Sequence, residues 1–315
     1  MSSMTRIGVV GAGRVGAVLA AALRDSSEDF PGSAGPPDSF EIVAVAGEST
    51  ASRERIATLL PGVHIDKPTA VARSCDLLLL TVPDDMLGNV VNMLSASGAI
   101  RQGQYVVHTS GRHGLDVLDA AAERGAHVLA MHPAMTFTGT GIDLARLSGC
   151  AFGVTASEQT RDLAVSLVTA LGGNLVWVPE DRRTLYHAGL AHGANHLVTL
   201  VSQAMDLLRE SGADDPAATL RPLLTAALDN ALSSGDAALT GPIVRGDVNT
   251  VRGHLVDIAA SAPATLESYV VLARATANRA VLDGRLLPIR AAKIIGMLND
   301  AVAAAPTVSR RQGIA

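Results

Sequence analysis

Short apolar runs alternate with stretches of helical periodicity through the first half of the chain. The apolar runs, rich in Val, Ile and Leu, cover residues 6–10, 40–46, 75–82, 104–110, 126–132, 150–156 and 174–178. Helical patterns such as residues 14–25 and 84–97 fall between them. This alternation predicts an α/β fold in which a doubly wound parallel sheet is covered by crossover helices.

The pattern changes beyond Pro179. Strand signals end there, and helical periodicity continues to about Ala305, with breaks at 211–216, 233–236 and 240–247. We therefore predict two domains, an α/β domain over residues 1–180 and an all-α domain over residues 181–315. Two segments are expected to lie outside this framework, a surface insertion at 26–39 and a frayed tail at 307–315.

Composition narrows the class of partner. The 315 residues are 48% hydrophobic and 17% charged, with a net charge of −5, which gives no reason to expect nucleic acid or an anionic membrane as partner. Cys75 and Cys150 are far apart and form no CxxC pair, and no apolar run is long enough to span a bilayer. The first residues lack the pattern of a secretory signal, so we expect a cytoplasmic protein.

A glycine motif, Gly11, Gly13 and Gly16, directly follows the first predicted strand and opens a helix. Gly11 permits the tight turn, Gly13 lets a pyrophosphate approach the backbone, and Gly16 allows the helix and strand to pack closely. The diphosphate then meets the exposed N–H groups of the helix N-terminus. The motif predicts a Rossmann dinucleotide site, to which Arg14 and Val15 also belong.

The end of the second strand bears on the choice between NADP(H) and NAD(H). Glu48 could hold the ribose hydroxyls of NAD, whereas Ser49, Thr50 and Arg53 could hold the 2′-phosphate of NADP. We favour NADP(H), with NAD(H) as the alternative.

Three later strands also end in small, polar or turn-forming residues. Val82 and Pro83 follow one strand, Ser110 follows the next, and His132 ends the third. The carboxyl edge of such a sheet is where its ligands bind, so we expect Val82, Pro83 and Ser110 near the cofactor. His132 could face the nicotinamide or only brace its loop. No GxSxG elbow surrounds Ser110, so a hydrolase is not expected.

Three histidines, His187, His192 and His196, fall on one predicted helix. His192 and His196 have the i, i+4 spacing of a zinc site, but Gly193 stands where such a site would carry a catalytic Glu, and no third ligand is apparent. We expect no metal. At 100° per residue, His187 shares an apolar stripe that should be buried. The stripe comprises Leu190, Ala194, Leu197, Val198, Val201 and Met205.

Six segments together carry a resemblance to a known family. They are GAGRVG, TVPDD, HTSG, HPAMTF, LYHAGLAHGANHLVTL and ALTGPIVRGDVNTVRGHL. Over nearly the whole chain they resemble the Rossmann-like family whose C-terminal half is called domain of unknown function 2520. That family resembles NADP-dependent reductases with helical C-terminal domains, which include ketopantoate reductase, pyrroline-5-carboxylate reductase, 3-hydroxyisobutyrate dehydrogenase and 6-phosphogluconate dehydrogenase. The resemblance implies reduction of a small 2-oxo acid, with ketopantoate, a precursor in pantothenate biosynthesis, as the leading substrate.

The resemblance also implies site residues. The related dehydrogenases carry a Lys four residues before an Asn on this helix; the Asn matches Asn195, but the Lys position is Ala191. We expect Asn195 to polarise the substrate carbonyl and His187, or a water that it holds, to supply the proton. A purely structural His187 is the alternative. Arg245 could clamp a substrate carboxylate beside Asp247, or Arg245 could be solvated while Asp247 only caps a helix.

These observations predict an NADPH-dependent reductase that dimerises through its helical domain and holds its active site between the two domains. Two other functions stay open. A pyrroline-5-carboxylate-type imine reductase would use the same cofactor with less need for an acid. A non-catalytic NADP-binding regulator would keep the glycine loop but need no substrate pocket.

Overall fold

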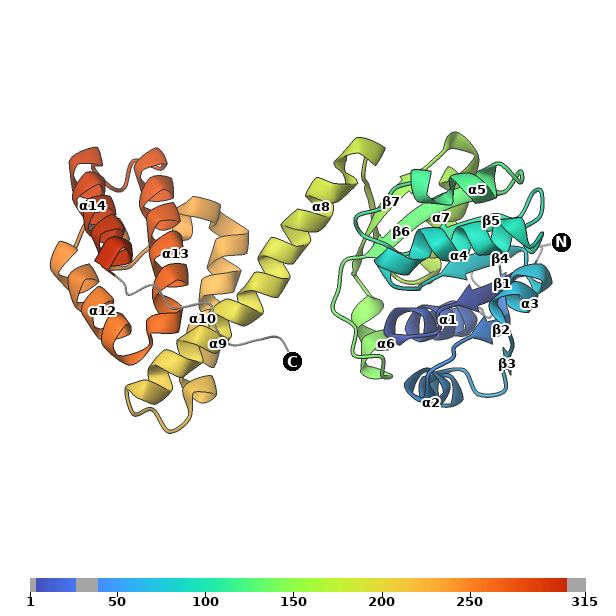
Figure 1. Cartoon of the computed structure of the whole chain (residues 1–315), viewed down its shortest axis with the longest axis horizontal. Coiled ribbons are helices and arrows are strands. Elements are labelled where there is room, and N and C mark those ends of the chain that lie inside the picture. Colours follow the sequence, from blue (N-terminus) through green and yellow to red (C-terminus); the bar gives the residue numbers. More distant parts are fainter. Residues whose placement is uncertain (1–3, 27–38, 305–315) are drawn as a thin grey trace. The chain divides into compact units, whose positions relative to one another are not determined.

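The computed structural model describes residues 4–26 and 39–304 of the chain (Figure 1). It divides into two compact units, Met1–Gly193 and Ala194–Ala315. The predicted boundary near residue 180 falls just before helix α8 (Arg183–Leu190), which packs with the first unit. Most of the predicted insertion at 26–39 and all of the predicted tail at 307–315 lie outside the described residues.

The first unit is built on one eight-stranded sheet. Its strands are β1 (Met4–Val10), β2 (Ser39–Ala46), β3 (His64–Ile65), β4 (Leu77–Leu80), β5 (Tyr105–His108), β6 (His127–Pro133), β7 (Ala151–Ala156) and β8 (Asn174–Trp177). Their order is β3-β2-β1-β4-β5-β6-β7-β8. The predicted doubly wound sheet is confirmed, with one exception. Strand β7 runs antiparallel to β6, because the connection between them leaves and re-enters the sheet at the same edge, where Pro133 pairs with Phe152.

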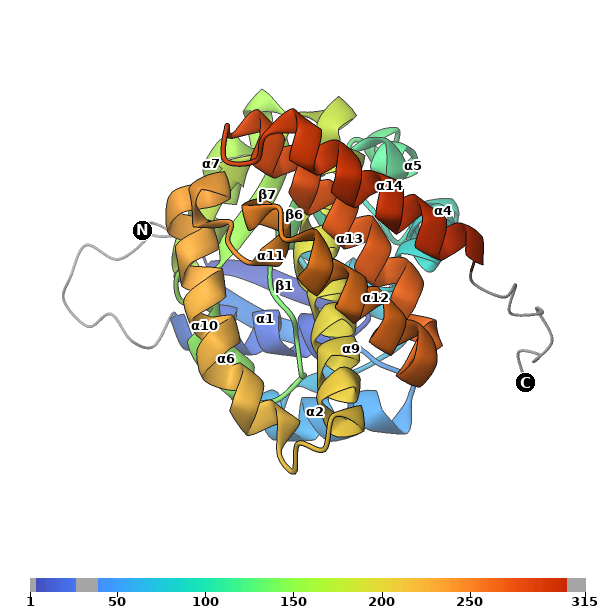
Figure 2. The same cartoon turned by 90° about the vertical axis from the view of Figure 1, so that its left-hand side faces the viewer.

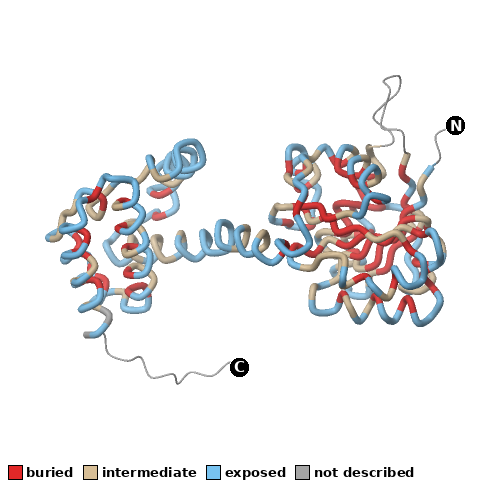
Figure 3. Tube along the Cα trace, turned by 90° about the horizontal axis from the view of Figure 1, so that it is seen from above, coloured by how far each residue is buried: buried red, intermediate tan, exposed pale blue. Residues whose placement is uncertain are grey.

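Helices cover both faces of this sheet. One apolar core lies under α1 (Arg14–Ser26), α2 (Thr50–Leu59), α6 (Ile142–Leu147) and α7 (Arg161–Ala170). The second lies under α3 (Pro68–Ser74), α4 (Asp84–Ala96) and α5 (Asp119–Ala122). The central strand β4 is buried throughout, as expected of a strand with helices on both sides. Figure 3 shows buried segments throughout the interior of the first unit.

The second unit is helical, as predicted. It contains α9 (His196–Glu210), α10 (Pro216–Ser234), α11 (Pro242–Arg245), α12 (Val248–Ser261), α13 (Pro263–Leu282) and α14 (Pro288–Ala304). Proline is the first residue of α10, α11, α13 and α14, where its missing N–H costs no helical hydrogen bond. Helices α12, α13 and α14 pack around one core that includes Val251, Val270 and Ile294 (Figure 2). None of the described helices is long and apolar enough to cross a membrane.

The helix with the three histidines departs from the prediction. Residues Ala191–Asn195 form a π-helical turn between α8 and α9, so a wheel of 100° per residue drawn from His187 loses its register there. The stripe that was expected to be buried is exposed in its middle, at Ala194, Leu197 and Val198, and only half-buried at its two ends. Val198 is 68% exposed and Leu197 is 39% exposed.

Candidate active site

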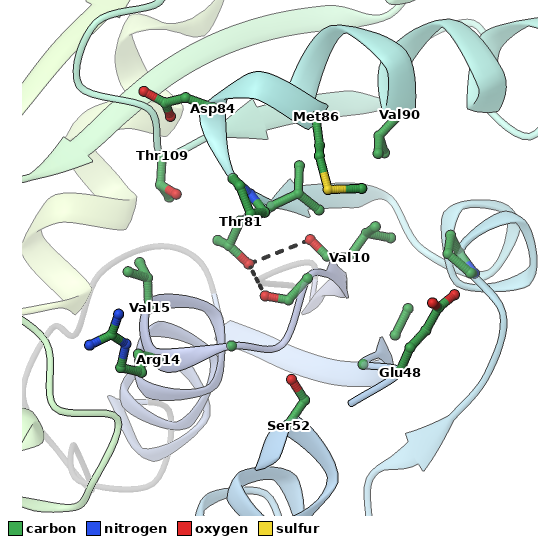
Figure 4. A pocket seen from close by; sticks show the side chains of 17 residues that line it. Val10, Arg14, Val15, Glu48, Ser52, Thr81, Asp84, Met86, Val90 and Thr109 are labelled. Carbon is green, nitrogen blue, oxygen red and sulfur yellow. Dashed lines mark hydrogen bonds between the residues drawn. The ribbon is translucent and has the colours of Figure 1, made fainter. Parts of the chain in front are cut away.

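A pocket of about 610 Å³ opens over the carboxyl ends of β1, β2 and β4. Its walls come from the glycine loop, from the residues after β2 and from the start of α4. Glu48 and Ser52 lie at one end, and Asp84 and Thr109 lie at the other (Figure 4). The volume suits a small-molecule ligand or cofactor, and the position is the edge where α/β sheets of this kind bind ligands.

The glycine loop has the geometry that the motif predicts. Gly11 adopts φ +95°, and a Cβ there would lie 2.8 Å from the carbonyl carbon of Thr81. A Cβ on Gly16 would collide with the Thr81 hydroxyl, so helix α1 and the end of β4 touch at this residue. At Gly13 no protein atom lies closer than 3.7 Å to such a Cβ. Gly13 therefore presents bare backbone to the pocket, as a pyrophosphate would require.

Thr81, directly after β4, contacts this loop and was not revealed by the motif. Its hydroxyl donates to the carbonyl of Gly11 at 2.7 Å and lies 3.4 Å from the carbonyl of Val10 (Figure 4). The threonine ties the end of β4 to the turn after β1, and it thereby fixes the floor of the pocket.

The residues after β2 divide into two groups. Ser49 is the N-cap of α2 and accepts from the Ser52 N–H at 3.1 Å, while Glu48 and Ser52 line the pocket. Thr50 and Arg53, predicted beside Ser49 as phosphate ligands, are exposed and do not line it. Of the other predicted cofactor residues, a larger group does line the pocket: Gly11, Gly13, Arg14, Val15, Val82 and Pro83.

A second cluster of polar side chains lies at the ends of β6 and β7, within the same unit. His132 Nδ1 is 3.1 Å from the phenol oxygen of Tyr186, and the two rings meet edge to face. The ring of His187 also meets that of His132 edge to face, with centroids 6.0 Å apart. The structure thus brings together the predicted His132 and His187, and it adds Tyr186 from the same turn of α8.

Two glycines make this approach possible. A Cβ on Gly111 would lie 2.5 Å from Cδ2 of His187 and 3.0 Å from Nε2 of His132. A Cβ on Gly153, in the middle of β7, would overlap the ring of Tyr186. Neither glycine has a positive φ, so the backbone conformation does not require glycine at these two residues. What requires it is the space that the aromatic rings occupy.

Arg183 lies one turn before Tyr186 and His187, and its hydrogen bonds attach this part of α8 to the ends of the strands. Its side chain is 1% exposed. The guanidinium donates to the carbonyl of Ser110 at 2.6 Å, to Oγ1 of Thr155 at 3.0 Å and to the carbonyl of Gly153 at 3.3 Å. Its Nε has no partner, and no ion pair joins it to a carboxylate among the described residues. Ser110, predicted as a cofactor ligand, thus holds Arg183 through its main chain.

Burial sets the charge of the histidines. Burial, and then the nearby charges of Arg183 and His187, lower the pKa of His132 to about 4. Burial lowers the pKa of His108 to about 4 as well, and that ring is held between the Ser110 N–H and the Gly114 carbonyl. Burial raises the pKa of the Tyr186 phenol. At neutral pH a neutral His132 ring therefore faces a protonated phenol.

The pocket and the cluster share neighbours. Asp84 lines the pocket, and its carboxylate opposes the lowering of the pKa of both His108 and His132. Arg112, in the loop after β5, lies 3.6 Å from that carboxylate. Thr109 lines the pocket, while the next residue, Ser110, binds Arg183. The cluster therefore lies at the end of the pocket opposite Glu48.

The remaining predicted residues belong to the second unit. Asn195 ends the π turn and is exposed, and Arg245 ends α11 and is also exposed. Asp247 caps α12, because its carboxylate accepts from the Thr250 N–H at 3.1 Å and from the Thr250 hydroxyl at 2.7 Å. These bonds lower the pKa of Asp247.

The fold and the glycine loop are those of a Rossmann-type domain, and the comparisons agree. Residues 2–133 match the family model of the Rossmann-like domain, and residues 150–276 match that of the domain of unknown function DUF2520. The chain thus carries a Rossmann-like domain followed by a DUF2520 domain, which confirms the resemblance found in the sequence.

Solved structures share this fold at low sequence identity. Protein BF3122 from Bacteroides fragilis is 21% identical with a TM-score of 0.69, over 87% of this chain and 98% of that one. The reductive aminase from Aspergillus terreus, in complex with NADPH and ethyl levulinate, is 18% identical with a TM-score of 0.59, over 93% and 99%. Pyrroline carboxylate reductase from Plasmodium falciparum, with NADP bound, is 12% identical with a TM-score of 0.55, over 94% and 99%. No curated protein matches the sequence.

Proposed function

We propose that the protein is an NADPH-dependent oxidoreductase that reduces the carbonyl group of a small 2-oxo acid, with ketopantoate as the first candidate. The observation that carries this proposal is the position of the Tyr186–His132 pair beside a dinucleotide pocket at the same edge of one sheet. The shared fold of the NADP- and NADPH-bound structures supports the choice of cofactor.

The residues of the pocket fit a dinucleotide. The bare backbone at Gly13 and the N-terminus of α1, a helix of 13 residues, would hold the diphosphate. Val82 and Pro83, on the way from the diphosphate to Asp84, would support the nicotinamide. When bound, NADPH supplies the hydride, and the protein supplies placement and electrostatics.

Reduction of a carbonyl also needs a proton, and we propose that Tyr186 gives it. Its phenol stays protonated at neutral pH, and on giving its proton to the product oxygen it would become a phenolate beside His132. In its Nδ1–H tautomer, a neutral His132 can give that proton to the phenolate while its Nε2 takes one from solvent. His187, predicted from sequence as the proton donor, lies against the same ring and stays the alternative donor.

The roles of Asn195, Arg245 and Asp247 remain predictions. We propose that Asn195 orients the substrate oxygen and that Arg245 binds the substrate carboxylate. The capping bonds of Asp247 favour a structural role for that residue. An Asn195→Ala variant tests the first role, since it should lose turnover while keeping its affinity for NADPH.

The experiment that tests the proposed function follows NADPH absorbance with a panel of small 2-oxo acids, ketopantoate included, and of cyclic and acyclic imines. Turnover of an oxo acid that is lost in Tyr186→Phe would support the proposal. Tight binding of NADPH without turnover of any substrate in the panel would favour a non-catalytic regulator and overturn it.

Imine reduction is the second candidate. Two of the structures with this fold are a reductive aminase and a pyrroline carboxylate reductase. An iminium substrate already carries its proton, so Tyr186→Phe would then change turnover much less than for a carbonyl substrate. The same panel therefore separates the two candidates through the effect of one variant.

We also propose that the protein forms a homodimer through its helical unit. Helix α9 presents Leu197, Val198 and Leu200 at the surface of the chain, at 39%, 68% and 43% exposure. Clusters of exposed apolar side chains of this kind commonly mark protein interfaces. Light scattering after size-exclusion chromatography measures the molar mass, and a monomer would contradict this part of the proposal.

A further inference from the structure

Two arginines from different helices contact the same glycine, and one of them, Arg14, lines the dinucleotide pocket. Gly139 has φ +81°, and a Cβ there would lie 2.7 Å from Cγ of Arg14 and 2.7 Å from Nε of Arg55. We propose that Arg14 and Arg55 together bind the 2′-phosphate of NADPH and so select it over NADH. This inference rests on the proposed function and assigns the phosphate to residues other than Ser49, Thr50 and Arg53.

The first argument is position. Arg14 is the first residue of α1, directly after the bare backbone of Gly13, and it lines the pocket. Arg55 lies on α2, three residues after Ser52, which also lines the pocket. Residues three apart lie on the same side of a helix, so Arg55 continues the pocket side of α2. Arg53 is rotated away from Ser52 and is exposed.

The second argument is the platform on which the arginines lie. Asp143 is fully buried, and its carboxylate accepts from the N–H groups of Thr138 and Gly139 at 2.8 and 2.7 Å and from the Thr138 hydroxyl at 3.0 Å. These bonds fix the loop that carries Gly139. A fixed loop limits the motion of both arginine side chains, which reduces the entropy lost when they bind an anion.

The third argument is charge. Neither Arg14 nor Arg55 forms an ion pair or a side-chain hydrogen bond with the rest of the described chain. Two arginine side chains that contact the same glycine and have no carboxylate partner favour a phosphate, which guanidinium binds in a bidentate manner. Glu48, the carboxylate at this end of the pocket, lies on the opposite side of the glycine loop from Arg14 (Figure 4). A phosphate on the arginine side would avoid its repulsion.

The test measures the dissociation constants of NADPH and NADH by fluorescence for the wild type and for Arg14→Ala, Arg55→Ala and Arg53→Ala. The Arg53 variant is the matched control, because it removes an arginine from the same helix. We expect Arg14→Ala and Arg55→Ala each to weaken NADPH about tenfold or more, while the affinity for NADH and both affinities of Arg53→Ala stay within about twofold.

A second pair of probes isolates the phosphate. Calorimetric titration with 2′,5′-ADP and with 5′-ADP compares ligands that differ in the 2′-phosphate alone, and Arg55→Lys should recover part of the affinity for the first. The inference is overturned if Arg53→Ala alone loses the preference for NADPH, or if Arg55→Ala weakens both cofactors alike. If the wild type still turns over NADPH when one of these two results is found, only the inference about Arg14 and Arg55 fails and the proposed function stands. If the wild type binds neither NADPH nor NADH, the inference and the proposed function both fail.

Discussion

The phenol oxygen of Tyr186 lies 3.1 Å from Nδ1 of His132, with the two rings at 86° to one another. His132 is the last residue but one of strand β6, and Tyr186 lies in the first turns of α8, more than 50 residues later in the chain. Because burial keeps His132 neutral at pH 7, its Nδ1 can accept the phenol proton. The bond orients Tyr186 and leaves the histidine able to return a proton.

The first prediction concerns that phenol. Tyr186→Phe removes the hydroxyl and keeps the ring, so the packing against Gly153 is preserved. We expect kcat to fall by about 100-fold or more, the usual contribution of a positioned general acid. The affinity for NADPH and the midpoint of thermal unfolding should change little. Steady-state kinetics with a carbonyl substrate measures this, and His187→Asn is the matched comparison. A larger loss in His187→Asn than in Tyr186→Phe would make His187 the proton donor.

The second prediction concerns the room that Gly111 leaves. A Cβ at this residue would lie 2.5 Å from His187 and 3.0 Å from His132, so in Gly111→Ala at least one of the rings must move. A shift of about 1 Å in an active site can cost about 100-fold in rate, and overpacking costs about 1–3 kcal/mol of stability. We therefore expect kcat of Gly111→Ala to fall strongly under conditions in which the variant is still folded, so that the loss of activity cannot come from unfolding.

Gly88→Ala in α4 provides the control for Gly111→Ala. There the nearest atom to the new methyl would be 3.8 Å away, at Val117. Alanine is a better helix former than glycine by about 1 kcal/mol, so this variant should keep its activity and unfold at a slightly higher temperature. Full activity in Gly111→Ala would contradict the placement of the two histidines.

The third prediction is a loss of stability in mild acid. His108 is fully buried, and its pKa of about 4 in the folded protein lies below the ordinary value of 6.5. Between these two pH values the unfolded chain takes up a proton that the folded chain refuses. The free energy of unfolding must therefore fall as the pH drops through this window. From about pH 7 to about pH 5, His108 alone accounts for about 2 kcal/mol.

Urea unfolding at the two pH values measures this slope. His108→Gln keeps a donor for the Gly114 carbonyl but cannot titrate, so its stability should depend less on pH. His64→Gln is the control, because the side chain of His64 is 70% exposed. An unchanged slope in His108→Gln would show that other groups cause the acid sensitivity.

Sequence reasoning predicted the sheet and the glycine loop because both have local signatures. Alternating apolar runs and the spacing of Gly11, Gly13 and Gly16 require no knowledge of what packs against them. The meeting of His132 with His187 was only half predicted. Both residues were candidates, but only the packing of α8 on the ends of β6 and β7 places their rings together.

The residues that were missed depend on such packing. Arg182 and Arg183 are neighbours of the same type, yet the first is exposed and the second is buried, which no pattern in the sequence distinguishes. One available signal was overlooked. Gly153 interrupts a predicted strand, and a glycine in a strand often marks a close approach, here by the ring of Tyr186. Gly193 lies in the π turn at Ala191–Asn195, but there it marks no close approach, because nothing lies within 4 Å of a Cβ at that residue.

The fourth prediction separates the charge of Arg183 from its hydrogen bonds. Arg183→Met removes both, and Arg183→Lys keeps the charge but loses the planar fork that reaches Ser110, Thr155 and Gly153. Each variant leaves buried acceptors unsatisfied, so both should be destabilised, by on the order of 3 kcal/mol. Stability alone therefore does not distinguish them.

The pKa of His132 does distinguish them. The positive charge of Arg183 is the second cause, after burial, that lowers this pKa to about 4. In Arg183→Met the pKa should rise but stay below 6.5, because the ring remains buried, whereas in Arg183→Lys it should stay close to the wild-type value. An NMR titration of the His132 ring measures both variants. If the pKa of His132 is the same in Arg183→Met as in the wild type, Arg183 acts on the cluster through its hydrogen bonds alone.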